Sequence, residues 1–225
     1  MVPFSFCSEE MCLVGGRALY WPREQALLVA DMHLEKASFF ARTGQMLPPY
    51  DSRETLERLA LAIRETGARR VFALGDNFHD NAGTSRIEPH AAGMLAALTR
   101  AVDWVWITGN HDNALDAGTG GAAVEEMTVS GVALRHITHR GETGAEISGH
   151  YHPRLMVNAR GRRIARSCAV GSERRLILPA FGALTGGMNA GDPAILKAMQ
   201  PAVAIDAILP ASGRIIRYPL WRAAA

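Results

Sequence analysis

Four short clusters of polar residues carry side chains that bind metal ions. They are Asp31-Met32-His33, Gly75-Asp76-Asn77-Phe78-His79-Asp80, Gly109-Asn110-His111-Asp112 and Gly149-His150-Tyr151-His152. Carboxylate, imidazole and amide donors suit hard or borderline divalent cations such as Mn²⁺, Fe²⁺ or Zn²⁺. The clusters offer enough donors for two ions, and two ions can clamp a phosphate ester for in-line attack.

Each cluster comes directly after a short apolar run that predicts a buried strand. The expected strands are residues 26–30, 70–74, 104–108, 132–135 and 145–148. Because ligands of α/β sheets bind at the carboxyl ends of strands, we expect the clusters to meet at one edge. Asp31 and His33 are two residues apart, as are His150 and His152, and in extended backbone such pairs point the same way.

Other patterns predict the elements that position these strand ends. Residues 51–65 read as a helix that opens with a capping box, Asp51-Ser52-Arg53-Glu54, and residues 87–100 as a second helix with Pro89 in its first turn. Strands are expected at 11–14 and 17–21, and at 163–170 and 174–178, each pair flanking a glycine turn. A short helix at 192–199 and strands at 203–208 and 214–218 complete the prediction.

Composition is that of an ordinary globular chain of 225 residues, 48% apolar and 20% charged, and we expect a single domain over residues 1–225. A formal charge of +2 does not by itself indicate nucleic-acid binding. Cys7, Cys12 and Cys168 are too few and too scattered for a disulfide framework. We see neither a signal peptide nor a membrane span, so we expect a cytoplasmic protein without membrane contacts.

The order of the four clusters resembles the calcineurin-like metallophosphoesterases, whose pattern is D-x-H, G-D, G-N-H-D/E, a lone His and G-H-x-H. Three further stretches, 148–153, 176–182 and Thr185-Gly186-Gly187, together with Gly-Asp-x-Phe-His, resemble the bacterial ligase-associated DNA damage response endonuclease family. The resemblance implies an α/β fold, a four-layer αββα sandwich of two mixed sheets.

The resemblance also implies a ligand set for two divalent ions. Asp31, His33 and His152 would hold one ion, Asn110 and His150 the other, and Asp76 would bridge them. The seventh ligand is a histidine between the last two clusters, where His136 and His139 compete. His136 is favoured because it ends a predicted strand. Mn²⁺ is the favoured metal, and Fe²⁺, Zn²⁺ and Mg²⁺ are alternatives.

Two further histidines are candidate catalytic groups. By resemblance, His111 faces the scissile phosphate, where an imidazole can stabilise charge or protonate the leaving oxygen. His79 stands where the protein-phosphatase branch has an acid, which argues against that branch and favours the nuclease branch. His79 would tune the action of His111 on the leaving group. Asp112 would hold the loop after the strand that precedes Gly109. The expected reaction is hydrolysis of a phosphodiester.

Seven arginines lie between residues 154 and 175, against one acid. Four of them, Arg160, Arg162, Arg163 and Arg166, are our candidate contacts to DNA phosphates, although a solvated hairpin face explains them equally well. The expected partner is DNA, and by resemblance a DNA ligase and helicase of the same repair system. A small-nucleotide phosphodiesterase, a phosphomonoesterase and a non-catalytic metal-binding scaffold remain alternatives. Sequence leaves the oligomeric state and the choice between endo and exo cleavage open.

Overall fold

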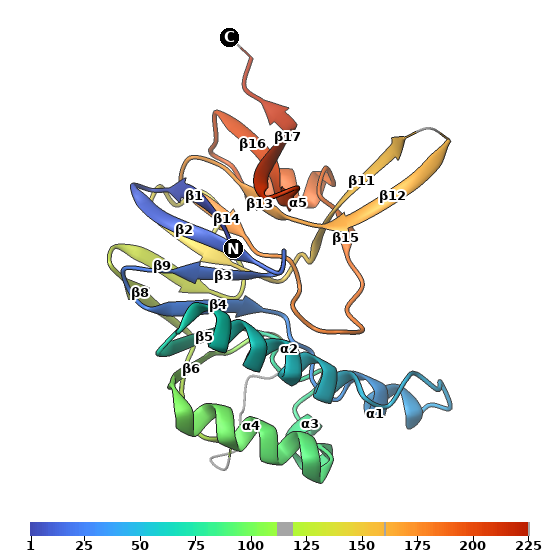
Figure 1. Ribbon diagram of the computed structural model, residues 1–225. Coiled ribbons are helices and arrows are strands. Elements are labelled where there is room, and N and C mark those ends of the chain that lie inside the picture. Colours follow the sequence, from blue (N-terminus) through green and yellow to red (C-terminus); the bar gives the residue numbers. More distant parts are fainter. Residues whose placement is uncertain (112–118, 160, 225) are drawn as a thin grey trace.

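Two seven-stranded mixed sheets pack face to face in the computed structural model, which describes residues 1–111, 119–159 and 161–224 (Figure 1). In the first sheet β1 to β4 run antiparallel and β4 to β7 parallel. Its strands, in spatial order, are β1 (Val2–Phe6), β2 (Glu9–Val14), β3 (Ala18–Trp21), β4 (Ala26–Ala30), β5 (Arg70–Leu74), β6 (Asp103–Ile107) and β7 (Ala122–Val124).

The second sheet has the spatial order β17-β16-β13-β14-β10-β9-β8, with β9, β10 and β14 parallel. Its strands are β8 (Glu126–Val129), β9 (Val132–Arg135), β10 (Ala145–Ser148), β13 (Ala169–Gly171), β14 (Arg175–Ile177), β16 (Ala204–Ala211) and β17 (Arg214–Arg222). A small third sheet consists of β11 (Pro153–Ala159), β12 (Arg162–Ser167) and β15 (Met188–Asn189).

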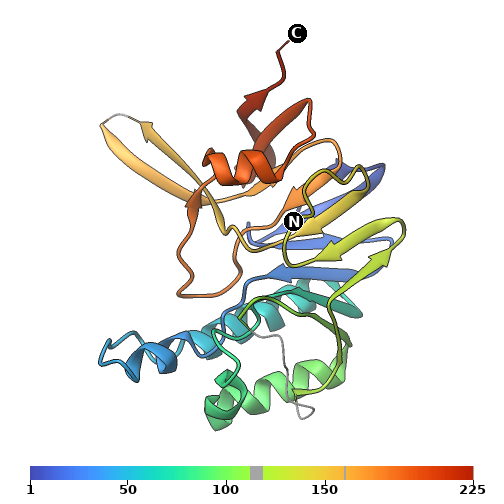
Figure 2. The same cartoon turned by 180° about the vertical axis from the view of Figure 1, so that it is seen from behind.

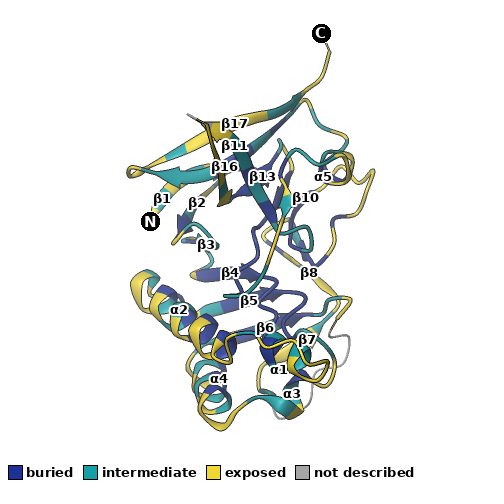
Figure 3. Ribbon diagram, turned by 90° about the vertical axis from the view of Figure 1, so that its right-hand side faces the viewer, coloured by how far each residue is buried: buried dark blue, intermediate teal, exposed yellow. Residues whose placement is uncertain are grey.

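Helices complete the outer layers. The first sheet is covered by α2 (Asp51–Thr66) and α4 (Pro89–Ala101), while α1 (Lys36–Ala41) contacts α2 and α3 (Gly83–Arg86) (Figure 2). The outward faces of α2 and α4 are exposed, while β4 and β5 are buried (Figure 3). Among the residues that the structure describes, α5 (Pro193–Ala198) and part of the small sheet cover the second sheet. The predicted αββα arrangement is confirmed, with a thin fourth layer.

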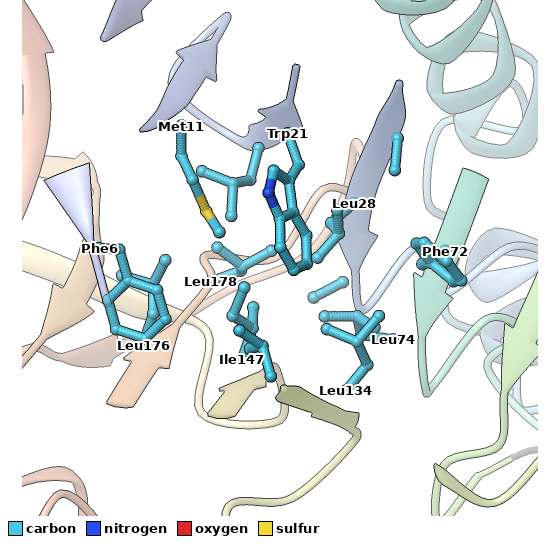
Figure 4. Close-up of a cluster of buried hydrophobic side chains, with 14 of the residues drawn as sticks. Phe6, Met11, Trp21, Leu28, Phe72, Leu74, Leu134, Ile147, Leu176 and Leu178 are labelled. Atoms are coloured by element: carbon cyan, nitrogen blue, oxygen red, sulfur yellow. The ribbon is translucent and has the colours of Figure 1, made fainter. Parts of the chain in front are cut away.

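The main hydrophobic core lies between the two sheets (Figure 4). Trp21 and Phe72 from the first sheet meet Leu134, Ile147 and Leu176 from the second, and all five side chains are almost fully buried. The Trp21 indole N–H is not left unpaired, because it donates to Glu9 Oε2 at 2.9 Å. This core fixes the two sheets against each other and therefore the relative positions of their strand ends.

Most expected elements form where the sequence predicts them. The strands at 26–30, 70–74, 132–135 and 145–148 match β4, β5, β9 and β10 at both ends, and Pro89 opens α4 as expected. No helix among the described residues is long and apolar enough to span a membrane.

The predicted capping box is wrong. The N-cap of α2 is Tyr50, which makes no side-chain cap. Asp51 Oδ2 instead accepts from the N–H of Ala37 at 3.1 Å, and Ser52 Oγ accepts from the N–H of Glu35 at 2.8 Å. These polar groups therefore tie the start of α2 to the start of α1.

The single strand predicted at 163–170 is also wrong. The chain leaves β12 at Ser167 and enters β13 at Ala169, so the two halves belong to different sheets. Cys168 between them is fully buried, and its N–H donates to Pro153 O. Residues 163–170 contain no glycine, proline, asparagine or aspartate, so the sequence carries no signal for such a change of sheet.

Arg175 belongs by sequence to the arginine-rich segment, but the structure buries it. Its guanidinium donates to the carbonyls of Ala198 (2.7 Å), Gln200, His139 (2.9 Å) and Glu142 (2.6 Å). Nε lies 3.4 Å from the buried Glu146 carboxylate. One side chain thus ties β14 to the loop after β9 and to the segment after α5.

We predict that R175M destabilises the fold by about 3–5 kcal/mol, because four carbonyls lose their donor and the buried Glu146 carboxylate loses one of the two arginines that pair with it. Urea unfolding at an unchanged m-value measures the loss. The neighbouring exposed Arg174 is the matched control, and R174M should change stability by less than about 0.5 kcal/mol. An R175M protein within about 1 kcal/mol of wild type would contradict this role.

Candidate metal centre

Five strand ends deliver polar side chains to one place. In the first sheet Asp31 follows β4, Asp76 lies two residues after β5, and Asn110 lies three residues after β6. In the second sheet His136 follows β9 and His150 lies two residues after β10. The loops are joined by backbone hydrogen bonds, since the N–H of Asp31 donates to Gly75 O and that of Gly149 to His136 O at 3.0 Å. The convergence predicted from sequence is present.

The donors form two groups that share one carboxylate. One group consists of Asp31, His33, Asp76 and His152, and the other of Asp76, His136 and His150. Within each group the donor atoms lie within 4.8 Å of one another. Asp76 Oδ2 lies 3.8 Å from His33 Nε2, and its Oδ1 lies 3.4 Å from His136 Nε2. Each oxygen of Asp76 therefore faces a different group.

Asn110 and His136 lie side by side in the second group. His136 Nε2 is 2.9 Å from Asn110 Oδ1 and 3.2 Å from His150 Nδ1. The rival histidine lies elsewhere, because the His139 side chain is exposed and contacts Glu142 Oε1 at 3.0 Å. Of the two alternatives left open by the sequence, the structure brings His136 to the cluster and leaves His139 outside it.

The chemistry of these donors fits divalent cations. Burial lowers the pKa of His33 to about 2, helped by the neighbouring charges of His152 and His79, and burial also lowers the pKa of His150. The two imidazoles are therefore neutral at pH 7. His33 Nε2 and His152 Nε2 face each other at 3.3 Å, and Asp31 Oδ1 is 3.5 Å from His152 Nε2. Buried carboxylates among neutral imidazoles need cations, and this set has the make-up of a dinuclear divalent metal site.

Five of these residues have left-handed backbone conformations. The φ angles are 52° at Asp31, 45° at His33, 44° at Asp76, 74° at His150 and 48° at His152. The expectation that the two pairs point together because their backbone is extended is therefore wrong, although both pairs do reach the cluster. Left-handed conformations of non-glycine residues cost about 1–3 kcal/mol each and concentrate at functional sites.

Gly75 makes room for the second group. A Cβ atom at this position would overlap the imidazole of His136, and the φ of Gly75 is +69°. Any side chain here would have to displace that ring, which is buried and whose Nδ1 lies 3.3 Å from Leu74 O. The glycine before Asp76 is thus required by the packing of the second sheet against the first.

His79 and His111 stack beside the cluster. Their rings lie 5.7 Å apart with an angle of 11°, and Nε2 of the half-exposed His111 is 3.9 Å from Asp76 Oδ2. Phe39 and Phe40 of α1 contact His79, with centroids 4.7 and 5.4 Å away. Sequence reasoning missed this helix, although Lys36, Phe39 and Phe40 have helical spacing just after the first cluster.

The acid next to His79 serves a structural contact. Asp80 pairs with both terminal nitrogens of Arg86 in α3, and Arg42 lies 3.9 Å away. It therefore does not replace the acid that the protein-phosphatase branch places beside its catalytic histidine. Asp112, expected to hold the loop after Asn110, lies outside the described residues.

The arginine hairpin starts at the site but extends away from it (Figure 1). β11 begins directly after His152, and Arg162, Arg163 and Arg166 are exposed on β12; Arg160 lies outside the described residues. Cross-strand pairing puts Arg162 and Arg166 on one face and Arg163 on the other. At ~3.3 Å per residue, Arg162, which pairs with Ala159, lies roughly 20 Å beyond His152, and Arg166, which pairs with Leu155, lies roughly 10 Å beyond it. The far end of the hairpin can therefore meet only an extended substrate.

The sequence profile of the calcineurin-like phosphoesterase family matches residues 25–155, which include all four clusters. The chain belongs to this family. Its metallophosphoesterase fold has a solved relative in Pseudomonas putida nuclease MPE, 27% identical with a TM-score of 0.74, covering 96% of this chain and 98% of that one. YfcE, a phosphoesterase from E. coli, is 14% identical with a TM-score of 0.42 over 87% and 99%. No curated protein matches significantly.

The metallophosphoesterase site gives a prediction about Gly75. G75A should lower the bound metal from about two ions to about one per chain, because the added methyl displaces His136 while Asp31, His33 and His152 remain in place. Elemental analysis after dialysis measures the ratio. G131A, at a turn glycine with φ +80° and open space around it, is the control for left-handed strain. Two ions retained in G75A would contradict this packing argument.

Proposed function

We propose that the protein is a dinuclear-metal-dependent nuclease that hydrolyses phosphodiester bonds in DNA. The observation that carries the proposal is that two groups of metal-binding side chains share Asp76. His111 lies exposed beside this shared carboxylate. Asp31, His33 and His152 would hold one cation, and Asn110, His136 and His150 the other, with Asp76 between them. Mn²⁺ is our proposed native metal, and the proposed location is the cytoplasm.

The bound cations would supply Lewis-acid activation of the phosphate and of the attacking water. The protein's own residues do the rest. The buried carboxylates and neutral imidazoles fix the donor positions before substrate arrives, so little reorganisation remains. His111 is close enough to Asp76 to reach a phosphate bound at the cluster, and it would protonate the leaving oxygen. His79 keeps the His111 ring in place by stacking.

Several observations support DNA as the substrate. The relative with 27% identity over nearly the whole chain is a nuclease. His79 takes the place of the acid found in protein phosphatases, and the carboxylate of the next residue, Asp80, is paired with Arg86. The hairpin that begins at His152 presents Arg162, Arg163 and Arg166 to an extended polyanion. A role in DNA repair, with a DNA ligase and helicase as partners, rests on the sequence resemblance alone.

A substrate panel tests the proposal. Metal-free protein reconstituted with Mn²⁺, Fe²⁺, Zn²⁺ or Mg²⁺ should cleave plasmid DNA and a linear oligonucleotide, and more slowly bis(p-nitrophenyl) phosphate. Chelation should abolish all three activities. Efficient cleavage of a cyclic dinucleotide or p-nitrophenyl phosphate, without cleavage of DNA, would favour the small-substrate alternatives. No hydrolysis with any metal would leave a metal-binding scaffold.

The same panel tests the hairpin. The variant R162A/R163A/R166A should bind DNA more weakly, and the slope of log affinity against log salt should fall by ~0.7–0.9 for each phosphate that these arginines no longer neutralise. Hydrolysis of bis(p-nitrophenyl) phosphate should change little, because a phosphate held at the metal centre lies roughly 10 Å or more from these side chains. Unchanged DNA affinity and salt slope would show that these arginines do not contact DNA and only keep the face of the hairpin solvated.

The role of His111 gives a separate prediction. H111A should lower kcat by about 10²–10⁴-fold, the range of a general acid–base group. Metal content should stay near two ions. H139A is the matched control, since His139 is exposed, pairs with Glu142 and lies outside the cluster. Loss of metal in H111A, or equal kinetics in the two variants, would remove His111 from the chemistry.

A further inference from the structure

The chain uses arginine for nearly all of its positive charge, because only Lys36 and Lys197 are lysines. Lys197 is exposed near the end of α5, in the layer that covers the second sheet. Lys36 is half-buried at the start of α1, three residues after His33. A lysine presents a compact charge at the end of a flexible stem, which suits the capture of a single phosphate oxygen.

Lys36 is held by a buried polar network. Glu35 before it has a left-handed backbone, and its N–H donates to Ser52 Oγ at 2.8 Å. Ser52 Oγ in turn donates to Glu35 Oε1 at 2.7 Å, and the N–H of Ala37 donates to Asp51 Oδ2 at 3.1 Å. Glu35, Asp51 and Ser52 are each at most 6% exposed. The network fixes the backbone on both sides of Lys36 against the start of α2.

The helix turns Lys36 toward the stacked histidines. Positions i, i+3 and i+4 of a helix share a face, so Lys36 lies on the face of Phe39 and Phe40. Both phenylalanine rings contact His79. The pKa of His79 is lowered to about 4 chiefly by burial, and the charge of Lys36 is the next largest cause. The same charge contributes to the low pKa of His33.

The ammonium group of Lys36 lacks a paired carboxylate among the described residues. Across the part of the chain that the structure describes, Lys36 makes no ion pair and no side-chain hydrogen bond. Asp51 is near enough to favour the charged form, but burial is the larger effect and lowers the pKa of Lys36. A positive charge kept partly out of water without a partner is costly unless an anion completes the site.

We propose that Lys36 is a substrate-positioning residue that binds a non-bridging oxygen of the phosphodiester next to the His33–His79 edge of the metal centre. The proposal rests on the proposed phosphodiesterase function and adds a contact that the metal-ligand motifs do not include. Phe39 and Phe40, on the same face of the helix, contact His79, so this face borders the site. The Glu35–Ser52–Asp51 network fixes the helix that carries it.

The experiment compares K36M, K36Q and K36R with K197M, using bis(p-nitrophenyl) phosphate as substrate and inorganic phosphate as competitive inhibitor. In K36M and K36Q, kcat/KM should fall about 10–100-fold, the size expected for one charge-assisted hydrogen bond, chiefly through KM. The inhibition constant for phosphate should rise similarly. K36R should stay close to wild type in kcat/KM and in phosphate inhibition because it keeps the positive charge. K197M should match wild type in both quantities. Metal content and melting temperature are measured for every variant.

The possible results separate the two proposals. Wild-type kinetics and phosphate inhibition in K36M or K36Q would overturn the role of Lys36 while leaving the phosphodiesterase function intact. Loss of metal or of folding in both neutral variants, with K36R equally damaged, would make Lys36 a structural support and would also overturn it. A wild-type protein that hydrolyses no phosphodiester with any metal would instead remove the function on which the inference rests.

Discussion

The buried carboxylate of Asp76 is the group that both halves of the site share. Its two oxygens face imidazoles delivered by different loops, and its own position is set by the end of β5, an inner strand of the first sheet. For both halves to reach it, the carboxyl ends of strands from two separate sheets must meet at one edge. The apolar core between Trp21 and Ile147, the glycine at position 75 and the strand registers all satisfy this requirement.

Collecting these groups is unfavourable for folding. Left-handed backbone at Asp31, His33, Asp76, His150 and His152 opposes the native state. The imidazoles whose pKa values are lowered by burial oppose it further below about pH 6.5, where they would be protonated in the unfolded chain. The rest of the fold must hold them in place. The inter-sheet core supplies non-directional burial, while Arg175 supplies directed contacts that fix the loop after His136. The free energy lost by holding the site residues in place is therefore offset by the inter-sheet core and by the hydrogen bonds of Arg175.

The sequence predicts the parts of the structure in which local signals agree. β4, β5, β9 and β10 are short runs with apolar residues at their centres, and each is followed by a glycine or a metal-binding residue, so their bounds follow directly. The capping box at Asp51 fails because a tertiary partner, the backbone of α1, competes for its carboxylate. The strand at 163–170 fails because a change of sheet at Cys168 has no local pattern. The place of Lys36 depends on three-dimensional packing, which spacing alone does not encode. The predicted strand end before His136 already favoured it over His139.

Anomalous diffraction measures directly whether one carboxylate joins two cation sites. Crystals grown with Mn²⁺ can be examined on either side of the manganese absorption edge. We expect two manganese peaks roughly 3.5–4 Å apart, with Asp76 between them. A single fully occupied peak, or two peaks of which only one lies within bonding distance of Asp76, would contradict the shared role of this carboxylate.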